Sequence, residues 1–556
     1  MKRNLLYILI PAIAAAMLAS CSDSFLDRDP MGVLDEDSYF ATDGAGMKLV
    51  ANCYQPMLDG FPYSINRVAM FHETVDDADC GGSDPGDRPQ TSEIGRGRPL
   101  ASNSLLLETW QHRYAAIGRC NSAIESLGKP DLKLVSGGEP VPQGTISRYL
   151  SEVKFLRAWY YFDLVNTFAG VPVIVSTLPP SERPPRGSLE DIRTQLYADL
   201  DDAIADPNLP ASKNLPNAEL GRATKDAAKT LKARIAMFFA GLMAQGKMQG
   251  DAAAEYAIAK QTAGDIINGS GLSLMPDFRD LYRGSYEAGP RSSESIFTVL
   301  RTYKPEIGFG GDAFCIMNVG RNSVGGWGGC CPTRDLAAAF EINDPRKQFT
   351  IISDGDIFPD AVGGEEVHNY RGYYNDYNLQ HSRKAFVPQS FRNARDLTRS
   401  NWVPYWMRYS EVLLIYAEAN LQTGGSKAES AEKLNQVRRR AFVTTSTKDE
   451  EAVYRKFGED LTPVDEATFN AQYAVKESDD LLKAIKHERR VELALEGLRL
   501  YDLVRWGEYA STMQAFYKKY GFADKGINAG ENSWPFPIPQ AEIDRSNGAL
   551  VQNPNY

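Results

Sequence analysis

Long stretches with apolar residues at helical spacing constrain the fold of this chain more than any other feature. Apolar side chains recur every third or fourth residue, and Gly or Pro stands near the ends of the stretches. The pattern predicts two sets of amphipathic α-helices. The first set spans 105–127, 146–168, 189–205, 224–245 and 252–267, and the second spans 409–421, 428–442 and 481–505.

Helices of this length, joined by short turns, favour antiparallel pairs that stack as in tetratricopeptide (TPR) repeats. The consensus of about 34 residues that marks those repeats cannot be traced in the chain. We therefore predict a mainly α fold, in which a TPR-like scaffold of helical pairs carries long loop-rich insertions and a few short strands.

The composition changes between the two helical sets. Residues 269–403 are rich in Gly, Pro, Asn, Tyr and Trp and show few helical periods, and a similar patch at 59–99 interrupts the first helices. Long ordered loops usually carry recognition. We expect an N-terminal helical region at 31–268 and a C-terminal region at 269–556, with the ligand site in the insertion 269–403.

The amino terminus has the pattern of a bacterial lipoprotein signal. Two basic residues precede an apolar run from Leu5 to Leu18, which is too short to remain as a spanning helix, and two small residues precede Cys21. We predict that residues 1–20 are removed, that Cys21 is lipidated with palmitate, and that 21–30 tether the protein to the membrane. An uncleaved anchor helix with an incidental cysteine is the alternative.

The charge balance restricts the partners. Acidic residues outnumber basic ones by 72 to 61, which gives a net charge of −11. This charge argues against nucleic acid or an anionic membrane surface as the main partner and favours a neutral ligand. Aromatic residues make up 10% of the chain, and their rings serve either as platforms for sugars or as core.

Six cysteines remain once Cys21 is assigned to lipid, an even number in a compartment that permits disulfides. Cys330 and Cys331 are adjacent and follow a glycine-rich run that contains Trp327. A disulfide between them would need a strained backbone, which glycines can supply, and would form a hard apolar face beside Trp327. Bridges to other cysteines, or free thiols, are at least as compatible with the sequence.

Catalytic motifs are absent. The chain has no His-Glu-x-x-His and no Gly-x-Ser-x-Gly, and its five histidines lack metal-ligand spacing. Residues 76–84 resemble a calcium loop but lack an oxygen ligand and the closing glutamate. We expect no catalytic residue, no metal and no cofactor. A pair of carboxylates for glycoside cleavage is defined in space, so a surface glycoside hydrolase remains an alternative.

The densest run of charges lies at 487–506, on one predicted helix. Glu488, Glu492 and Glu496 recur every fourth residue and would line one helical face. An active site is one interpretation. We favour ion-pair ladders, because acids and bases alternate with Leu and Val and would neutralise one another.

Four motifs, in this order behind the lipoprotein signal, resemble the RagB/SusD family of outer-membrane nutrient-binding lipoproteins of Bacteroidetes. The resemblance covers nearly the whole mature chain. The motifs are KFLRAWYYFDLV at 154–165 with Gly170-Val171-Pro172, YWMRYSEVLLIYAEA at 405–419, the charged run at 487–506, and FPIP at 536–539 with QNPNY at 552–556.

The resemblance implies a helical scaffold with an irregular ligand face. It also implies a partner, a SusC-like TonB-dependent outer-membrane transporter, over which the lipoprotein closes as a lid while it delivers oligomers for import. Catalysis is not implied, and the expected place is the outer membrane, on the cell surface. Ligand sites differ between family members, so no binding residue is carried over from the motifs.

The candidate ligand residues therefore come from the two insertions, where aromatic faces and hydrogen-bonding groups occur together as carbohydrate recognition requires. We expect the protein to bind an oligosaccharide; an oligopeptide ligand is the alternative within the binding class. Each candidate could instead be a turn, core or partner-interface residue. The candidates are Trp327, Cys330, Cys331, Arg371, Tyr373, Tyr374 and Tyr377 in the second insertion and Asp76, Asp77 and Asp79 in the first.

Overall fold

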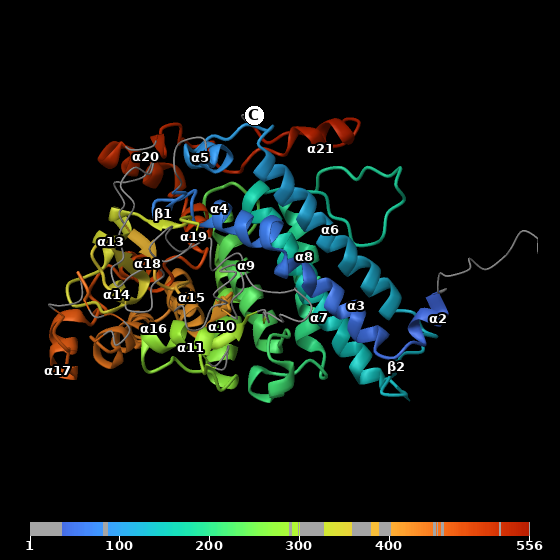
Figure 1. Cartoon of the computed structure of the whole chain (residues 1–556), viewed down its shortest axis with the longest axis horizontal. Helices are drawn as coiled ribbons and strands as arrows, with labels where there is room; N and C mark the ends of the chain where they lie inside the picture. The colour runs from blue at the N-terminus through green and yellow to red at the C-terminus, as the bar shows by residue number, and fades with distance from the viewer. Residues whose placement is uncertain are drawn as a thin grey trace, which may run out of the picture.

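α-Helices dominate the computed structural model (Figure 1). No helix in the described part of the chain has the length and hydrophobicity needed to cross a bilayer. The structure describes residues 36–81, 87–287, 292–298, 300, 327–358, 380–387, 402–448, 452, 454–456, 461–521, 524–554 and 556.

Eight helices form the scaffold, and each packs against the next in a continuous series. The pairs α6–α7, α7–α8, α8–α9 and α9–α10 are neighbours, and α10 continues through α15 to α16, so the two predicted sets of helices form one stack. The prediction of stacked helical pairs is confirmed. The eight helices are α3 (Ala45–Tyr54), α6 (Ser104–Leu127), α7 (Gln143–Phe168), α8 (Leu189–Ala205), α9 (Lys225–Ala244), α10 (Ala252–Gly269), α15 (Tyr409–Gln422) and α16 (Lys427–Arg439).

Side-chain caps explain where several scaffold helices begin. Ser188 and Asp191 form a reciprocal capping box at the start of α8, and Thr224 accepts a hydrogen bond from the Ala227 N–H at the start of α9. Asp251 caps α10 in the same way. These caps satisfy amide groups that a helix start leaves without partners. They place the ends of these helices within about two residues of the predicted ranges.

The core is one large apolar cluster that draws on both helical sets. Helix α7 lies inside it, and every side chain from 155 to 168 is buried. Its polar members are paired: Asp163 accepts hydrogen bonds from Arg67 at 2.5 Å and from Arg113 at 3.2 Å. Arg157 makes a two-pronged pair with Asp199 on α8. The charged residues of the 154–165 motif therefore hold the scaffold together.

The strands in the described ranges are short and form four antiparallel pairs. This agrees with the few short strands that the sequence predicts. The pairs are β1 (Ala78–Asp79) with β5 (Cys331–Pro332), β2 (Val135–Ser136) with β3 (Glu139–Pro140), β4 (Ser295–Phe297) with β8 (Met407–Arg408), and β6 (Ile351–Ser353) with β7 (Gln380–Ser382).

The prediction of one long helix at 481–505 is wrong, because the segment is divided into α18 (Leu481–Glu492) and α19 (Arg499–Arg505). Leu495 and Gly497 interrupt it with φ values of 60° and 78°. Arg489 and Asp502 pair across the break at 2.9 Å. Glu492 and Glu496 can therefore point to partners on other elements.

Shorter helices complete the fold. The α-helices are α2 (Glu36–Phe40), α4 (Asn66–Phe71), α5 (Pro89–Gly95), α11 (Phe278–Glu287), α13 (Arg334–Ala339), α14 (Arg346–Thr350), α17 (Glu466–Thr468), α20 (Tyr509–Tyr520) and α21 (Gln540–Arg545). The 3₁₀-helices span Gln55–Leu58, Ser212–Asn214 and Asn217–Glu219, and the π-helical turns span Gly60–Ile65, Arg440–Thr444 and Phe469–Tyr473.

Candidate functional site

The two insertions that the sequence singled out meet in the structure. Strand β1 of the first pairs with β5 of the second, so that Asp79 lies opposite Cys331. The Thr333 hydroxyl donates to the Asp76 carbonyl at 2.6 Å, and its N–H donates to the Asp77 carbonyl at 2.9 Å. Sequence alone could not show this junction, because about 250 residues separate the two strands.

Trp327 and the two adjacent cysteines lie at this junction. Trp327 is partly exposed, whereas both cysteines are buried. Cys330 is a free thiol, so the disulfide to Cys331 that the sequence left open is not formed. Its sulfur lies 3.5 Å from Nδ1 of His72.

The backbone at Cys330 is strained. Its φ of 47° lies in the left-handed region, which residues with a side chain rarely adopt and which costs about 1–3 kcal/mol. The Cys330 N–H donates to the Glu73 carboxylate at 2.8 Å and so helps to hold this conformation. The glycine-rich run suggested a strained backbone, and the strained residue is Cys330 itself. Its conformation helps to position the segment beside Trp327.

The acidic candidates of the first insertion are already paired inside the protein. Asp76 accepts hydrogen bonds from Arg499 at 2.9 and 2.8 Å, and Asp77 accepts one from Arg490 at 2.7 Å. Burial alone would raise the pKa of Asp76, but the guanidinium groups of Arg490 and Arg499 outweigh it and hold the pKa well below its usual value. Asp76 and Asp77 are therefore not part of the candidate site.

Asp79 is buried as well, and its carboxylate accepts a hydrogen bond from the Cys80 N–H at 2.8 Å. Among the described residues, no group of three or more His, Cys, Asp or Glu side chains is arranged to hold a metal ion. The other candidates, Cys21, Arg371, Tyr373, Tyr374 and Tyr377, lie outside the described residues.

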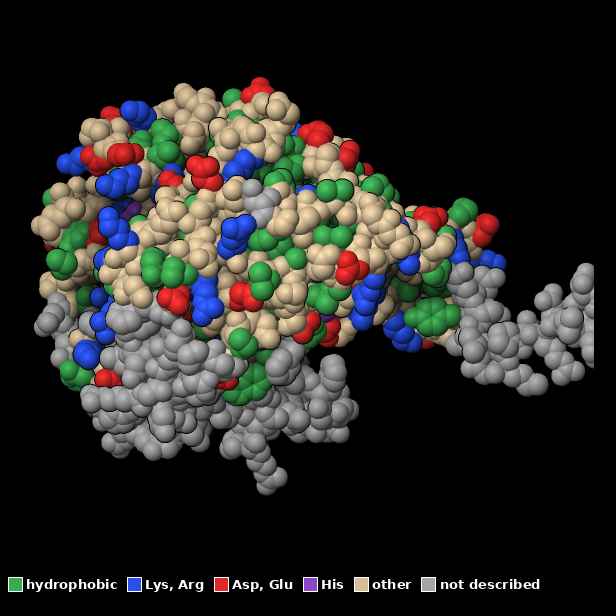
Figure 2. Space-filling model, turned by 90° about the horizontal axis from the view of Figure 1, so that it is seen from above, with side chains coloured by type: hydrophobic (Ala, Val, Ile, Leu, Met, Phe, Trp, Pro, Cys, Tyr) green, Lys and Arg blue, Asp and Glu red, His purple; other side chains and the backbone are tan. Residues whose placement is uncertain are grey.

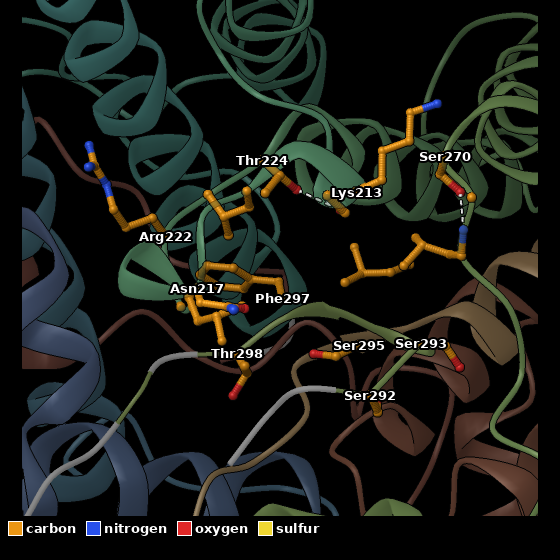
Figure 3. Close-up of a pocket in the computed structure, with 17 residues that line it drawn as sticks. Lys213, Asn217, Arg222, Thr224, Ser270, Ser292, Ser293, Ser295, Phe297 and Thr298 are labelled. Carbon is orange, nitrogen blue, oxygen red and sulfur yellow. Dashed lines mark hydrogen bonds between the residues drawn. The ribbon is translucent and has the colours of Figure 1, made fainter. Parts of the chain in front are cut away.

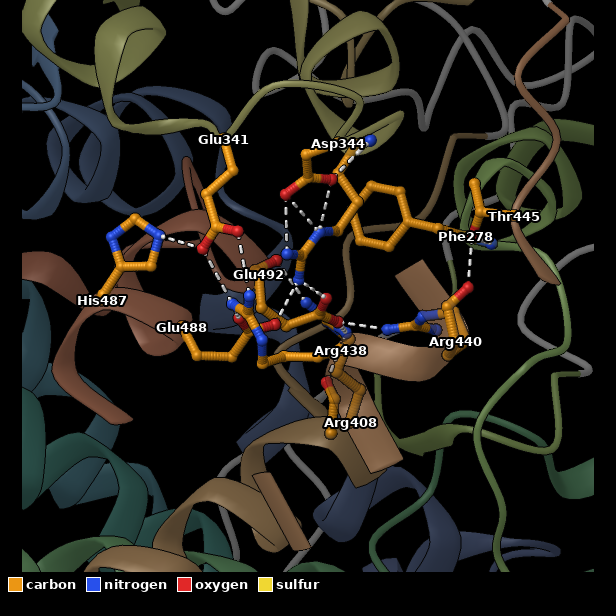
Figure 4. Close-up of polar contacts among 12 residues, drawn as sticks. Phe278, Glu341, Asp344, Arg408, Arg438, Arg440, Thr445, His487, Glu488 and Glu492 are labelled. Atoms are coloured by element: carbon orange, nitrogen blue, oxygen red, sulfur yellow. Dashed lines mark hydrogen bonds and ion pairs between the residues drawn. The ribbon is translucent and has the colours of Figure 1, made fainter. Parts of the chain in front are cut away.

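A buried network of ion pairs joins parts of the second insertion to the helical segments that follow it (Figure 4). Glu294 directly precedes β4, Arg408 lies in β8, and Lys384 follows β7, so the network ties these segments to α18. We call it the ion-pair network. Its members are Glu294, Glu341, Asp344, Arg346, Lys384, Arg408, Arg438, Arg440, Glu488, Glu492 and Glu496.

Glu492 is the centre of the ion-pair network. It pairs with Arg346 at 2.8 Å and also with Arg408 and Arg440. Burial would raise its pKa, but the three guanidinium groups, Arg440 first, keep the pKa well below its usual value. The sequence-based choice of a structural role for these acids agrees with this geometry. Their partners, however, come from α14, β8 and the end of α16 rather than from their own helix.

A pocket of about 290 Å³ opens beside β4, within the second insertion (Figure 3). One wall is the 212–224 segment between α8 and α9, and the other is formed by 270–272 and 292–298. Its volume lies at the lower end of the usual range for small-ligand sites, about 300–1,000 Å³. Seven hydroxyl groups line it, those of Ser212, Thr224, Ser270, Ser292, Ser293, Ser295 and Thr298.

Several of these hydroxyls are fixed by hydrogen bonds within the protein. The Thr298 hydroxyl donates to the Pro404 carbonyl at 2.6 Å, and Ser212 and Thr224 bond to each other at 3.1 Å. Lys213 and Arg222 stand on opposite sides of the pocket in Figure 3. The pocket therefore combines fixed hydroxyl groups and an exposed cation at its rim with apolar side chains. The apolar lining residues are Leu215, Leu220, Leu272, Ile296 and Phe297.

The charge of the pocket favours some ligands over others. Arg222 is neutralised by Glu152 and Glu219, whereas Lys213 is exposed and donates to the Gly269 carbonyl at 3.1 Å. None of the described residues that line the pocket is Asp or Glu. Hydroxyl, amide and ammonium groups without a carboxylate suit a neutral or acidic polyol better than a basic ligand.

The sequence analysis anticipated one wall of this pocket and missed the other. The wall at 270–298 belongs to the predicted insertion 269–403. In the sequence, the wall at 212–224 is part of a connection between two predicted helices and carries no recognition motif. Its length was the available signal, because helices in a bundle are usually joined by about 2–8 residues and this connection covers 206–224.

Comparison with known proteins identifies the family. The model of the SusD family matches residues 294–556, and a model described as starch-binding associating with outer membrane matches residues 99–237. SusD-like protein P2 of Formosa agariphila is 24% identical over 558 residues, covering 97% of each chain.

Solved structures share the fold. Surface glycan-binding protein A from Bacteroides fluxus has a TM-score of 0.69 at 24% identity, over 93% of this chain and 100% of its own. Surface glycan-binding protein A from Bacteroides thetaiotaomicron in complex with laminarihexaose also has a TM-score of 0.69, at 22% identity, over the same shares. These matches, together with the stacked helical pairs and the motifs, show that the chain belongs to the SusD/RagB family.

Proposed function

We propose that this protein is a lipid-anchored, non-catalytic glycan-binding protein of the cell surface. It captures an oligosaccharide at the pocket between the second insertion and the 212–224 segment and passes it intact to a SusC-like TonB-dependent outer-membrane transporter. The observation that carries the proposal is the polar pocket beside β4, in a fold whose solved neighbours include a protein bound to laminarihexaose. The predicted lipoprotein signal with Cys21 supplies the anchor.

The chemistry of the pocket supports a sugar ligand. Sugars need several hydrogen-bonding groups at fixed positions and an apolar surface for the ring face. The pocket offers hydroxyl groups, Asn217 and apolar side chains such as Leu215 and Ile296. Trp327 does not line the pocket; it is partly exposed at the junction of the insertions, where it offers a further apolar contact for a longer glycan. A basic oligopeptide fits less well, because the pocket carries Lys213 and no carboxylate among its described lining residues.

The same lining residues argue against hydrolysis at this pocket. Glycosidases usually act with two carboxyl groups on either side of the scissile bond. The acids of the ion-pair network do not line this pocket and are held by arginines. The protein therefore holds its ligand without cleaving it.

Calorimetric titration with laminarihexaose, maltohexaose, cellohexaose and a peptide mixture tests the proposal. We expect one of the hexasaccharides to bind, and chromatography to recover it intact. Ser293→Trp, which fills the pocket from an exposed lining position, should weaken binding at least tenfold, whereas Ser511→Trp on the exposed face of α20 should not. Binding of peptides alone, or shortened sugar products, would refute the proposal.

A further inference from the structure

A second groove lies on the scaffold, away from both insertions. It has a volume of about 650 Å³ and runs between α6, the 172–184 segment and α21 with the C-terminal tail. In Figure 1 the segment between α7 and α8 projects beyond α6 below α21. None of its described lining residues belongs to the insertions 59–99 and 269–403, so the proposed glycan site does not account for this groove.

The floor of the groove contains a glycine that the fold does not require. Gly118 lies in the interior of α6, is exposed, and has no protein atom within 4 Å of the position a Cβ would take. Gly46 and Gly241, also inside helices, have protein atoms at 2.7 and 2.1 Å from that position. Glycine in a helix interior costs about 0.5–1 kcal/mol relative to alanine. Packing explains Gly46 and Gly241, whereas Gly118 keeps open a space that the protein itself does not fill.

The floor beside Gly118 is aromatic. Tyr114 and Trp110 lie about one and two turns before it on α6, with ring centroids 5.0 Å apart. The Tyr114 hydroxyl donates to the Pro172 carbonyl at 2.8 Å, which fixes the ring against the opposite wall. Trp110 is only 4% exposed and packs edge-on against Phe168, so it supports Tyr114 from beneath. The surface that a flat, partly apolar ring can contact is that of Tyr114 beside Gly118.

The rims are polar. On one side Gln111 donates to Glu542 at 2.7 Å, and Arg545, with 65% of its side chain exposed, pairs with the same carboxylate. On the other side Asn121 donates to the carbonyls of Ile174 and Ser176 and holds the wall in place. An aliphatic ligand would cover the charged groups of Glu542 and Arg545 without offering them hydrogen bonds. Removing these groups from water would then weaken the binding of such a ligand.

We propose that this groove is a second carbohydrate-binding site, for a short neutral oligosaccharide. One sugar ring lies over Gly118 and against Tyr114, and its hydroxyl groups bond to the rims at Arg545, Glu542 and Gln111. The inference rests on the proposed glycan-binding function and adds a second site to it. Two sites on one molecule would hold a longer glycan at two points and so raise its avidity.

The test is the stoichiometry of calorimetric titration with laminarihexaose, and with maltohexaose and cellohexaose in parallel. We expect two sites in the unaltered protein. Gly118→Phe fills the groove and should leave one site. Ala115→Phe adds the same bulk to an exposed position of α6 that does not line the groove, and should keep both. Hydrogen exchange of the 172–184 segment should slow with sugar in the unaltered protein and not in Gly118→Phe.

The outcomes separate the two proposals. If the unaltered protein, Gly118→Phe and Ala115→Phe each show one sugar site, and Ser293→Trp removes that binding, the groove proposal is overturned and the glycan-binding function stands. Unchanged sugar binding in Gly118→Phe together with lost co-purification of a membrane transporter would assign the groove to a protein partner and also overturn it. Absence of binding to every hexasaccharide would overturn both.

Discussion

Neutralising Glu492 should destabilise the fold more than any surface substitution. Its side chain is fully buried and pairs with Arg346, Arg408 and Arg440. Glu492→Gln keeps the shape of the side chain but removes the charge, which leaves three guanidinium groups with less compensation. Removing one partner of a buried ion pair costs about 3–5 kcal/mol. We expect the free energy of unfolding to fall by this amount.

The measurement is urea unfolding, in which the midpoint should fall while the dependence on urea stays unchanged. Glu466→Gln is the matched control, because Glu466 pairs with Arg439 at 3.1 Å with both side chains about half exposed. Such a pair contributes about 0–1 kcal/mol.

A double variant tests the charge argument directly. Arg440→Met removes one of the guanidinium groups that Glu492→Gln leaves undercompensated, so the double variant should lose less stability than the sum of the single ones. If Glu492→Gln lowers the free energy of unfolding by no more than Glu466→Gln does, the neighbouring acids compensate the arginines without the charge of Glu492. The reasoning about its central position would then be refuted.

Three further predictions concern acid stability, the junction and the helix interior. Burial, and next the charge of Arg67, lower the pKa of His72 in the folded protein to about 3. In the unfolded chain the pKa is near 6.5, so below about pH 6.5 the unfolded state takes up a proton that the folded state does not, and the free energy of unfolding falls with the pH. Between pH 7 and pH 4 the unaltered protein should lose about 3 kcal/mol more than His72→Gln; equal losses would contradict this. Trp327→Ala should weaken binding of the identified hexasaccharide at least tenfold in titration, and unchanged affinity would remove Trp327 from the ligand site. Gly118→Ala should raise the unfolding free energy by about 0.5–1 kcal/mol, whereas a lower urea midpoint would reveal a contact that the open space does not suggest.

Helical periodicity was sufficient to predict seven of the eight scaffold helices, whereas α3 was not predicted. Side-chain caps at Ser188, Thr224 and Asp251 mark the starts of α8, α9 and α10, but α3, α7 and α15 begin without one. Helical periodicity failed at 481–505, where the pattern continues but the helix does not. The break depends on Leu495 and Gly497 in left-handed conformations and on partners such as Arg346 that are remote in sequence. Local spacing cannot show that a glutamate is paired with an arginine about 140 residues away.

The candidate site was less predictable than the fold, for the same reason. One wall of the pocket lies within the predicted insertion 269–403 and the other lies outside it. The sequence analysis assigned Asp76 and Asp77 to ligand binding, although Arg490 and Arg499 already occupy their oxygens. Short acidic runs in loops look alike whether they face solvent or a buried guanidinium group, and only tertiary contacts distinguish the two.

The position of the ion-pair network explains how one scaffold can carry different ligand faces. Glu294 and Lys384 lie within the second insertion and Arg408 lies just after it. Arg408 pairs with Glu294 and with Glu492 of α18, and Lys384 donates to the Glu492 carbonyl, so these segments are fixed to the end of α18. Directional, buried charge pairs fix these segments without requiring a particular loop sequence between them. Substitutions in the network should therefore alter stability first, whereas Ser293→Trp in the pocket should alter sugar affinity with little loss of stability. The unfolding midpoint and the sugar affinity of the same variants separate these two effects.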